Sequence, residues 1–130
     1  MKGLLTGLML LAGAAQADEA AIRGVIDGQL EAFRSDDVAT AFTFAAPGIR
    51  DIFRNPQVFG RMVREGYPMV WRNGRIQYLE ATGDGSGWRQ EVLITDAAGR
   101  LHTLAYTMVE TPDGWKIAGV EILRDPGVGV

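Results

Sequence analysis

Few residues in this sequence could act as a catalytic nucleophile or hold a metal ion. The chain has 130 residues with no cysteine and one histidine, His102, and its serines are Ser35 and Ser86. A serine or cysteine hydrolase needs a nucleophile, a base and an orienting acid. Ser35 lies where a helix is expected to start and Ser86 lies in a glycine-rich loop, both common structural positions for serine. His102 has no partner at metal-ligand spacing. We therefore expect no catalytic residue, no metal site and no cofactor.

A turn between two strands sets the pairing of the most apolar part of the sequence. Asp96-Ala97-Ala98-Gly99 combines an aspartate that opens a type I turn with a glycine suited to a bulge, which pairs Asp96 with Arg100. Because side chains alternate across a sheet, every second residue inward from this turn shares one face, and that face must be covered by helices. The predicted pairs on it are Ile94 with His102, Val92 with Leu104, Gln90 with Tyr106, and Trp88 with Met108.

Tyr106 and Gln90 are polar residues in the middle of this apolar face. Buried hydroxyl and amide groups need partners, which are either other groups of a closed core or a ligand. Both interpretations stay open at this point. An enzyme using such a pocket would take Tyr106 as acid and His102, near the rim, or a pocket carboxylate as base. The candidate pocket residues are Tyr106, Gln90, Trp88, Met108, His102 and Tyr78.

A second turn, Thr111-Pro112-Asp113-Gly114, has the same chemistry and predicts Thr111 opposite Trp115. The next predicted pairs are Met108 with Ala118, Tyr106 with Val120, and Leu104 with Ile122. The opposite face of the sheet carries a mixed set of side chains, suited to solvent or to a second subunit. A homodimer through this face would use Ala105, Thr107, Val109 and Ile117.

Arginines are concentrated in the middle of the chain. The formal net charge of the whole sequence is −3, which makes it a poor nucleic-acid binder. Arginines on an amphipathic helix usually keep its polar side in water, and the alternative is a site for an anionic ligand or a partner. The candidate patch for the second interpretation consists of Arg50, Arg54, Arg61 and Arg64.

Apolar periodicity divides the chain into a helical first half and a strand-forming second half. A first helix is expected behind Asp18 and Glu19, whose carboxylates favour a helix start. Ser35, Asp36 and Asp37 are expected to end this helix and to cap a short one over residues 38–45. Another short helix is expected over residues 49–53, and a further one after the cap Asn55. Strands are expected from Met69 onward, the earliest over roughly residues 75–82.

The N-terminus has the composition of a signal peptide. Lys2 precedes an apolar stretch over residues 4–14, which runs into the small-residue pattern Ala15-Gln16-Ala17. The stretch is too short to span a bilayer of about 30 Å as a helix. We expect cleavage between Ala17 and Asp18, no membrane span after cleavage, one domain over residues 18–124 and a flexible tail over 125–130. The expected location is the periplasm or the extracellular space.

Several core and turn segments carry a resemblance to a known family. They are Ile22–Phe33, Pro47-Gly48-Ile49-Arg50, Met62–Tyr67, Leu93–Arg100, Tyr106-Thr107 and Pro112-Asp113-Gly114-Trp115. On these segments the chain is similar to an uncharacterised family of exported proteobacterial proteins, the domain-of-unknown-function family 4864, within the nuclear transport factor 2-like superfamily. The resemblance implies an α+β cone, with N-terminal helices packed on a curved, mainly antiparallel sheet. It implies no activity, because fold alone does not establish function.

These observations favour a non-catalytic function. We expect an exported domain that binds a small, partly apolar ligand, or a partner, through a pocket between helices and sheet. The alternatives are a small lyase or isomerase that uses the same pocket and a structural scaffold that dimerises through the sheet face.

Overall fold

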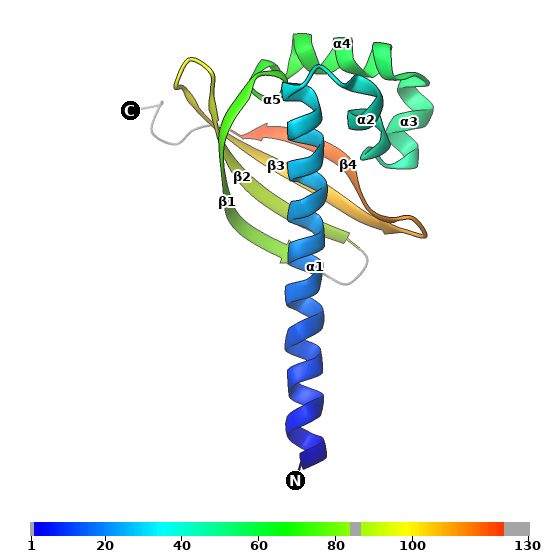
Figure 1. Cartoon of the computed structure of the whole chain (residues 1–130), viewed down its shortest axis with the longest axis vertical. Coiled ribbons are helices and arrows are strands. Elements are labelled where there is room, and N and C mark those ends of the chain that lie inside the picture. The colour runs from blue at the N-terminus through cyan, green and yellow to red at the C-terminus, as the bar shows by residue number, and fades with distance from the viewer. Residues whose placement is uncertain (1, 84–86, 124–130) are drawn as a thin grey trace.

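A long helix lies across a curved four-stranded sheet, and shorter helices cover one end of it (Figure 1). The computed structural model describes residues 2–83 and 87–123. The helices are α1 (Lys2–Arg34), α2 (Val38–Thr43), α3 (Pro47–Phe53), α4 (Pro56–Gly66) and α5 (Pro68–Trp71). The strands are β1 (Asn73–Gly83), β2 (Gly87–Asp96), β3 (Leu101–Thr111) and β4 (Gly114–Leu123). The tail expected at 125–130 and most of the glycine-rich loop, residues 84–86, lie outside the described residues.

Helix α1 starts much earlier than the sequence predicted. It begins at Lys2 rather than near Asp18, and it continues through Ala17 without a break. The reason is composition, because the leucines and alanines before Asp18 are themselves strong helix formers. The N-terminal half of α1 extends past the strands in Figure 1. No helix in the described ranges has an apolar segment long enough to cross a bilayer. Cleavage after Ala17 stays a prediction.

Helices α2 and α4 begin directly after the expected caps Asp37 and Asn55, whereas α3 begins at Pro47 and not at residue 49. The Asp37 carboxylate accepts a hydrogen bond from the Thr40 N–H at 3.1 Å, and the Asn55 side chain accepts from the Val58 N–H at 2.9 Å. Such caps satisfy amide groups that have no partner within the helix. The expectation of strands from Met69 onward was wrong, because α5 intervenes before β1. Its first residue is Pro68, whose fixed φ suits the start of a helix.

The sheet is an antiparallel meander in the order β1-β2-β3-β4. The predicted register between β2 and β3 is confirmed from Trp88–Met108 to Ile94–His102. Gly99 of the intervening turn has φ 86°, a left-handed value that glycine adopts without a steric penalty. Leu104, Tyr106 and Met108 are fully buried, so this face lies against the helices as expected.

The register between β3 and β4 was predicted correctly only at its inner end. Tyr106 pairs with Val120 and Leu104 with Ile122, as predicted. At the turn, however, Trp115 pairs with Glu110 and not with Thr111, and Met108 pairs with Ile117 and not with Ala118. A bulge at Ala118 absorbs the one-residue difference. Ile117 therefore faces the helices, with 2% of its surface exposed, and cannot contribute to a dimer on the opposite face.

Candidate functional site

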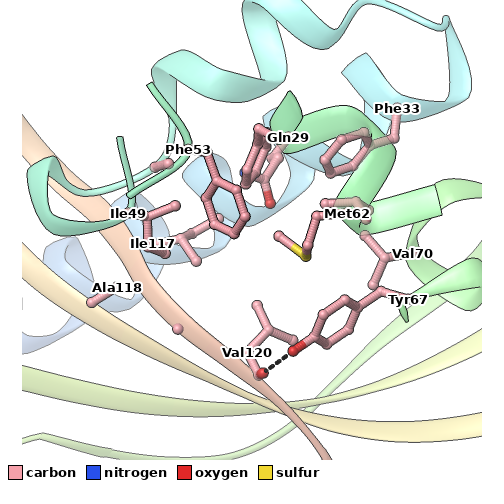
Figure 2. A pocket seen from close by; sticks show the side chains of 14 residues that line it. Gln29, Phe33, Ile49, Phe53, Met62, Tyr67, Val70, Ile117, Ala118 and Val120 are labelled. Carbon is pink, nitrogen blue, oxygen red and sulfur yellow. Dashed lines mark hydrogen bonds between the residues drawn. The ribbon is translucent and has the colours of Figure 1, made fainter. Parts of the chain in front are cut away.

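A cavity of about 290 Å³ lies between the short helices and β4. Figure 2 shows its lining side chains converging from α1, from α3 and α4, from the α4–α5 connection and from β4. Apart from Gln29 and Tyr67, the lining that residues 2–83 and 87–123 provide is apolar and carries no charged side chain. The apolar lining residues are Phe33, Ala45, Ile49, Phe53, Phe59, Met62, Val63, Val70, Ile117, Ala118, Gly119 and Val120.

The helical wall of the cavity is held by aromatic packing around Phe59 of α4. The Phe59 ring centroid lies 6.0 Å from that of Phe33, 5.3 Å from Phe42 and 5.9 Å from Phe53. Aromatic pairs at such separations attract one another beyond the effect of burial alone. Because Phe33, Phe42 and Phe53 belong to α1, α2 and α3, this cluster fixes four helices relative to one another.

The strand wall is positioned by backbone contacts between β4 and the α2–α3 connection. The Ile117 N–H donates to the Phe44 carbonyl at 2.9 Å, and the Ala46 N–H donates to the Ile117 carbonyl at 2.8 Å. The bulge at Ala118 shifts the alternation of side chains by one residue, so that Ile117 and Val120, which would otherwise lie on opposite faces, both line the cavity. This local irregularity therefore shapes the strand side of the site.

Two polar side chains face the cavity, Gln29 and Tyr67 (Figure 2). Gln29 is 3% exposed, and its Nε2 donates to the Ala41 carbonyl of α2 at 3.1 Å. The half-buried Tyr67 donates its hydroxyl hydrogen to the Val120 carbonyl at 3.1 Å. Gln29 thus connects α1 to α2, and Tyr67 connects the α4–α5 connection to β4, while each keeps acceptor capacity on its oxygen.

Tyr106 and Gln90, the centre of the predicted pocket, lie instead in the closed core. Both are fully buried, and neither lines the cavity. Within the described part of the chain, the Tyr106 hydroxyl and the Gln90 Oε1 have no hydrogen-bond partner, although Gln90 Nε2 donates to the carbonyls of Glu91 and Leu79. Burial raises the pKa of the Tyr106 hydroxyl above its ordinary value of 10.0.

The other predicted pocket residues on this part of the sheet also lie outside the cavity. Tyr78 packs under α1 and donates its hydroxyl to Asp27 Oδ1 at 2.5 Å, and its pKa is raised by burial and by that carboxylate. Trp88 packs edge-on against Trp115 at 6.3 Å between ring centroids. Met108 is fully buried in the core. Ligand binding by these residues stays a prediction that no contact with the cavity supports.

His102 lies at the far end of its face, beside the β2–β3 turn. Its Nε2 is 2.9 Å from Asp96 Oδ2. The contact with His102, helped by the Arg100 N–H, lowers the pKa of Asp96 below its ordinary value of 3.8. Asp96 also accepts from the N–H groups of Ala98 and Arg100, both at 2.9 Å. This network closes the turn, and His102 does not reach the cavity lining.

The four arginines of the candidate anion patch divide between two shallow hollows. Arg50 and Arg54 border one hollow with Asp51, while Arg61 and Arg64 border another beside Trp71. Over the described residues none of the four forms an ion pair. The guanidinium of Arg50 lies over the Phe42 ring and that of Arg64 over Trp71, 5.5 and 5.8 Å from the ring centroids. An anionic partner at this surface stays a prediction.

The comparisons agree on the family and the fold. A family model described as "Domain of unknown function (DUF4864)" matches residues 15–130. The chain belongs to this family. The α+β, nuclear transport factor 2-like fold that the sequence predicted is likewise confirmed. No curated protein sequence matches the chain.

Three solved structures illustrate this fold. A domain of unknown function with a cystatin-like fold from Nostoc punctiforme has a TM-score of 0.60 at 14% identity, covering 84% of this chain and 78% of its own. An NTF2-like protein from Novosphingobium aromaticivorans has a TM-score of 0.55 at 16% identity, with 97% and 91% covered. A putative dehydratase of the NTF2-like family from Streptomyces avermitilis has a TM-score of 0.54 at 14% identity, with 81% and 94% covered. At these identities the likeness concerns the fold alone.

The sequence analysis did not assign the lining residues to a pocket, and Gln29 and Tyr67 are the polar ones that it missed. Gln29 stands between Ile26, Leu30 and Phe33 on the apolar stripe of α1, where a polar residue is unexpected. A polar residue within this apolar stripe was a signal in the sequence that pointed to the site. Tyr67 follows Gly66 at the end of α4, and nothing in its local sequence distinguishes it from an ordinary loop tyrosine.

Proposed function

We propose that this protein is an exported, non-catalytic domain that binds a small, mainly apolar molecule in the cavity between α3, α4 and β4. One observation carries the proposal: a cavity of about 290 Å³ whose lining, over the described part of the chain, is apolar except for Gln29 and Tyr67. Ligand pockets in proteins combine an apolar wall with a few polar groups in this way. A dry apolar cavity of about 150 Å³ already accommodates benzene, so this one has room for a two-ring molecule.

The enzyme alternative has less support from the lining. A lyase or isomerase that moves a proton needs an acid or base at the substrate, and Tyr67 is the one titratable side chain among the described lining residues. The fold neighbour named as a putative dehydratase is the reason to test for turnover of any ligand that binds. A change in the ligand during incubation with the protein would favour the enzyme alternative.

Filling the cavity tests the proposal directly. We expect purified protein to bind naphthalene, measured by a change in naphthalene fluorescence, and Met62→Trp and Val120→Phe to weaken that binding at least tenfold. Both changes add bulk to lining positions. Ile52→Trp is the matched control, because Ile52 lies on α3 with 72% of its surface exposed and does not line the cavity.

Two outcomes of this experiment would contradict the proposed function. If the wild-type protein does not bind naphthalene, or if the filled variants are folded by circular dichroism and bind it as the Ile52→Trp control does, the cavity is not a binding site. Using two filling variants on opposite walls guards against the case in which one of them fails to fold.

A further inference from the structure

The two polar side chains in the cavity restrict the ligand further than its apolar lining does. We propose that the ligand is an uncharged, mainly apolar molecule that carries one O–H or N–H group, donated to Gln29. This inference rests on the proposed function, since it concerns the same cavity. The class includes phenols, alcohols and neutral N–H heteroaromatic molecules, and it excludes carboxylates and ammonium ions. A molecule that only accepts hydrogen bonds would leave the Gln29 oxygen unpaired.

The orientation of the Gln29 amide is fixed by a neighbouring helix. Its Nε2 donates to the Ala41 carbonyl at 3.1 Å. Rotating the amide by half a turn would place its oxygen against that carbonyl, two acceptors facing each other, so the nitrogen must stay on this side. Figure 2 shows the oxygen at the other end of the amide directed into the space between the lining side chains. Among the described residues this oxygen has no hydrogen-bond partner.

Tyr67 likewise offers an acceptor. Its single hydroxyl hydrogen is donated to the Val120 carbonyl at 3.1 Å (Figure 2). What remains on the oxygen are lone pairs, which accept and do not donate. At their oxygens, both polar groups therefore accept a hydrogen bond that the ligand must donate. The second hydrogen of Gln29 Nε2 is the remaining donor, and it belongs to the end of the amide that the Ala41 carbonyl holds toward α2, so a ketone or an ester would leave the Gln29 oxygen unpaired.

The residues that line the cavity also exclude a charged ligand. Among the described residues, the lining contains no arginine, lysine or histidine, so a carboxylate placed there would lose its hydration without gaining a countercharge. A cation would likewise meet no carboxylate. A neutral, mainly apolar molecule with one donor group loses the least hydration free energy on entering the cavity. Its donor also forms a hydrogen bond with the oxygen of the buried Gln29 side chain.

Four probes of similar shape test the inference on the wild-type protein. We expect 1-naphthol to bind about five- to tenfold more tightly than naphthalene at neutral pH, the range that one neutral hydrogen bond supports. 1-Methoxynaphthalene keeps the oxygen but has no hydrogen to donate, so it should bind no better than naphthalene. 1-Naphthoate should bind weakest. Isothermal titration calorimetry gives all four dissociation constants under one set of conditions.

Two variants identify the acceptor. In Gln29→Met, a change of similar volume, the preference for naphthol over naphthalene should fall below twofold while naphthalene still binds. In Tyr67→Phe, which keeps the amide, the preference should persist. A preference lost in Tyr67→Phe and kept in Gln29→Met would overturn the assignment to Gln29. The four-probe comparison on the wild-type protein stands even if Gln29→Met does not fold.

The outcomes separate this inference from the function on which it rests. Equal binding of naphthol, naphthalene and methoxynaphthalene would overturn the donor requirement and leave the cavity as an apolar binding site. Tightest binding of naphthoate would overturn the exclusion of charge. Failure of every probe to bind would overturn the proposed function itself, and the inference with it.

Discussion

Replacing Tyr106 with phenylalanine should stabilise this protein, although it removes a polar group from the centre of the sheet. The Tyr106 side chain is fully buried, and its hydroxyl has no hydrogen-bond partner among the described residues. A hydroxyl buried without a partner costs roughly 1 to 3 kcal/mol in proteins. Phenylalanine keeps the ring and its packing and removes only the oxygen. We therefore expect the free energy of unfolding to rise by about 1 kcal/mol, the lower end of that range, and Tm to rise by about 4 °C.

Tyr78→Phe is the matched control for this prediction. The change is chemically identical, but the Tyr78 hydroxyl donates to Asp27 Oδ1 at 2.5 Å. Its loss should lower the free energy of unfolding by about 1 kcal/mol, because the bond reaches a carboxylate that is itself exposed to water. Urea denaturation followed by tryptophan fluorescence measures both variants. The two tyrosines should therefore give changes of opposite sign.

A second measurement concerns alkaline pH. The pKa of Tyr106 is raised in the folded protein by burial, so the stability linked to its protonated form is complete below about pH 10, the unfolded value, and is lost as pH rises further. Tyr106→Phe should therefore lose less stability than the wild-type protein between about pH 9 and 11. A loss of 1 kcal/mol or more at neutral pH would refute the reasoning, because it would show that the hydroxyl is hydrogen-bonded in solution.

Two further predictions concern the β2–β3 turn and the N-terminus. Contacts with His102 and the Arg100 N–H lower the pKa of Asp96 below 3.8, so the stabilisation that its charge gives is complete above about pH 4 and is lost as pH falls through the lowered pKa. The stability difference between wild type and Asp96→Asn, measured by urea denaturation, should therefore shrink on acidification below about pH 4, and a constant difference would contradict this. Protein recovered from its native host should begin at Asp18, which intact mass can establish; a chain beginning at Met1 or Lys2 would contradict export by cleavage.

The sequence predicted correctly those features that interactions between residues close in the chain determine. Asp37 and Asn55 cap the following helices because a cap needs only a side chain and a nearby N–H. The β2–β3 register followed from one turn, since Asp96 and Gly99 determine which residues face each other. Helix α5 was missed because four residues show no periodicity, although Pro68 marks its start.

The predicted β3–β4 register was wrong near the turn, where contacts with residues distant in the sequence determine the pairing. The backbone of Ile117 exchanges hydrogen bonds with Phe44 and Ala46, residues about seventy positions earlier in the chain. Those bonds hold Ile117 against the helices, and the bulge at Ala118 makes this compatible with the pairing of Tyr106 and Val120. No turn rule applied to residues 111–114 contains that information. The cavity depends on the same contacts, so it could not be predicted from the turn sequence either.

The distribution of polar groups explains why the predicted and observed sites differ. A polar residue on an apolar face was used as evidence for a ligand, and Tyr106 and Gln29 both satisfy that criterion. They differ in what surrounds them: the Tyr106 hydroxyl lies in a closed core, whereas Gln29 lies beside a gap between helices and strand. Sequence periodicity assigns a face to a residue, but it does not say whether the facing elements fill the space. Here Phe33, Phe53 and Phe59 hold the helices in place, so a cavity remains over β4 while the sheet beneath α1 is closed.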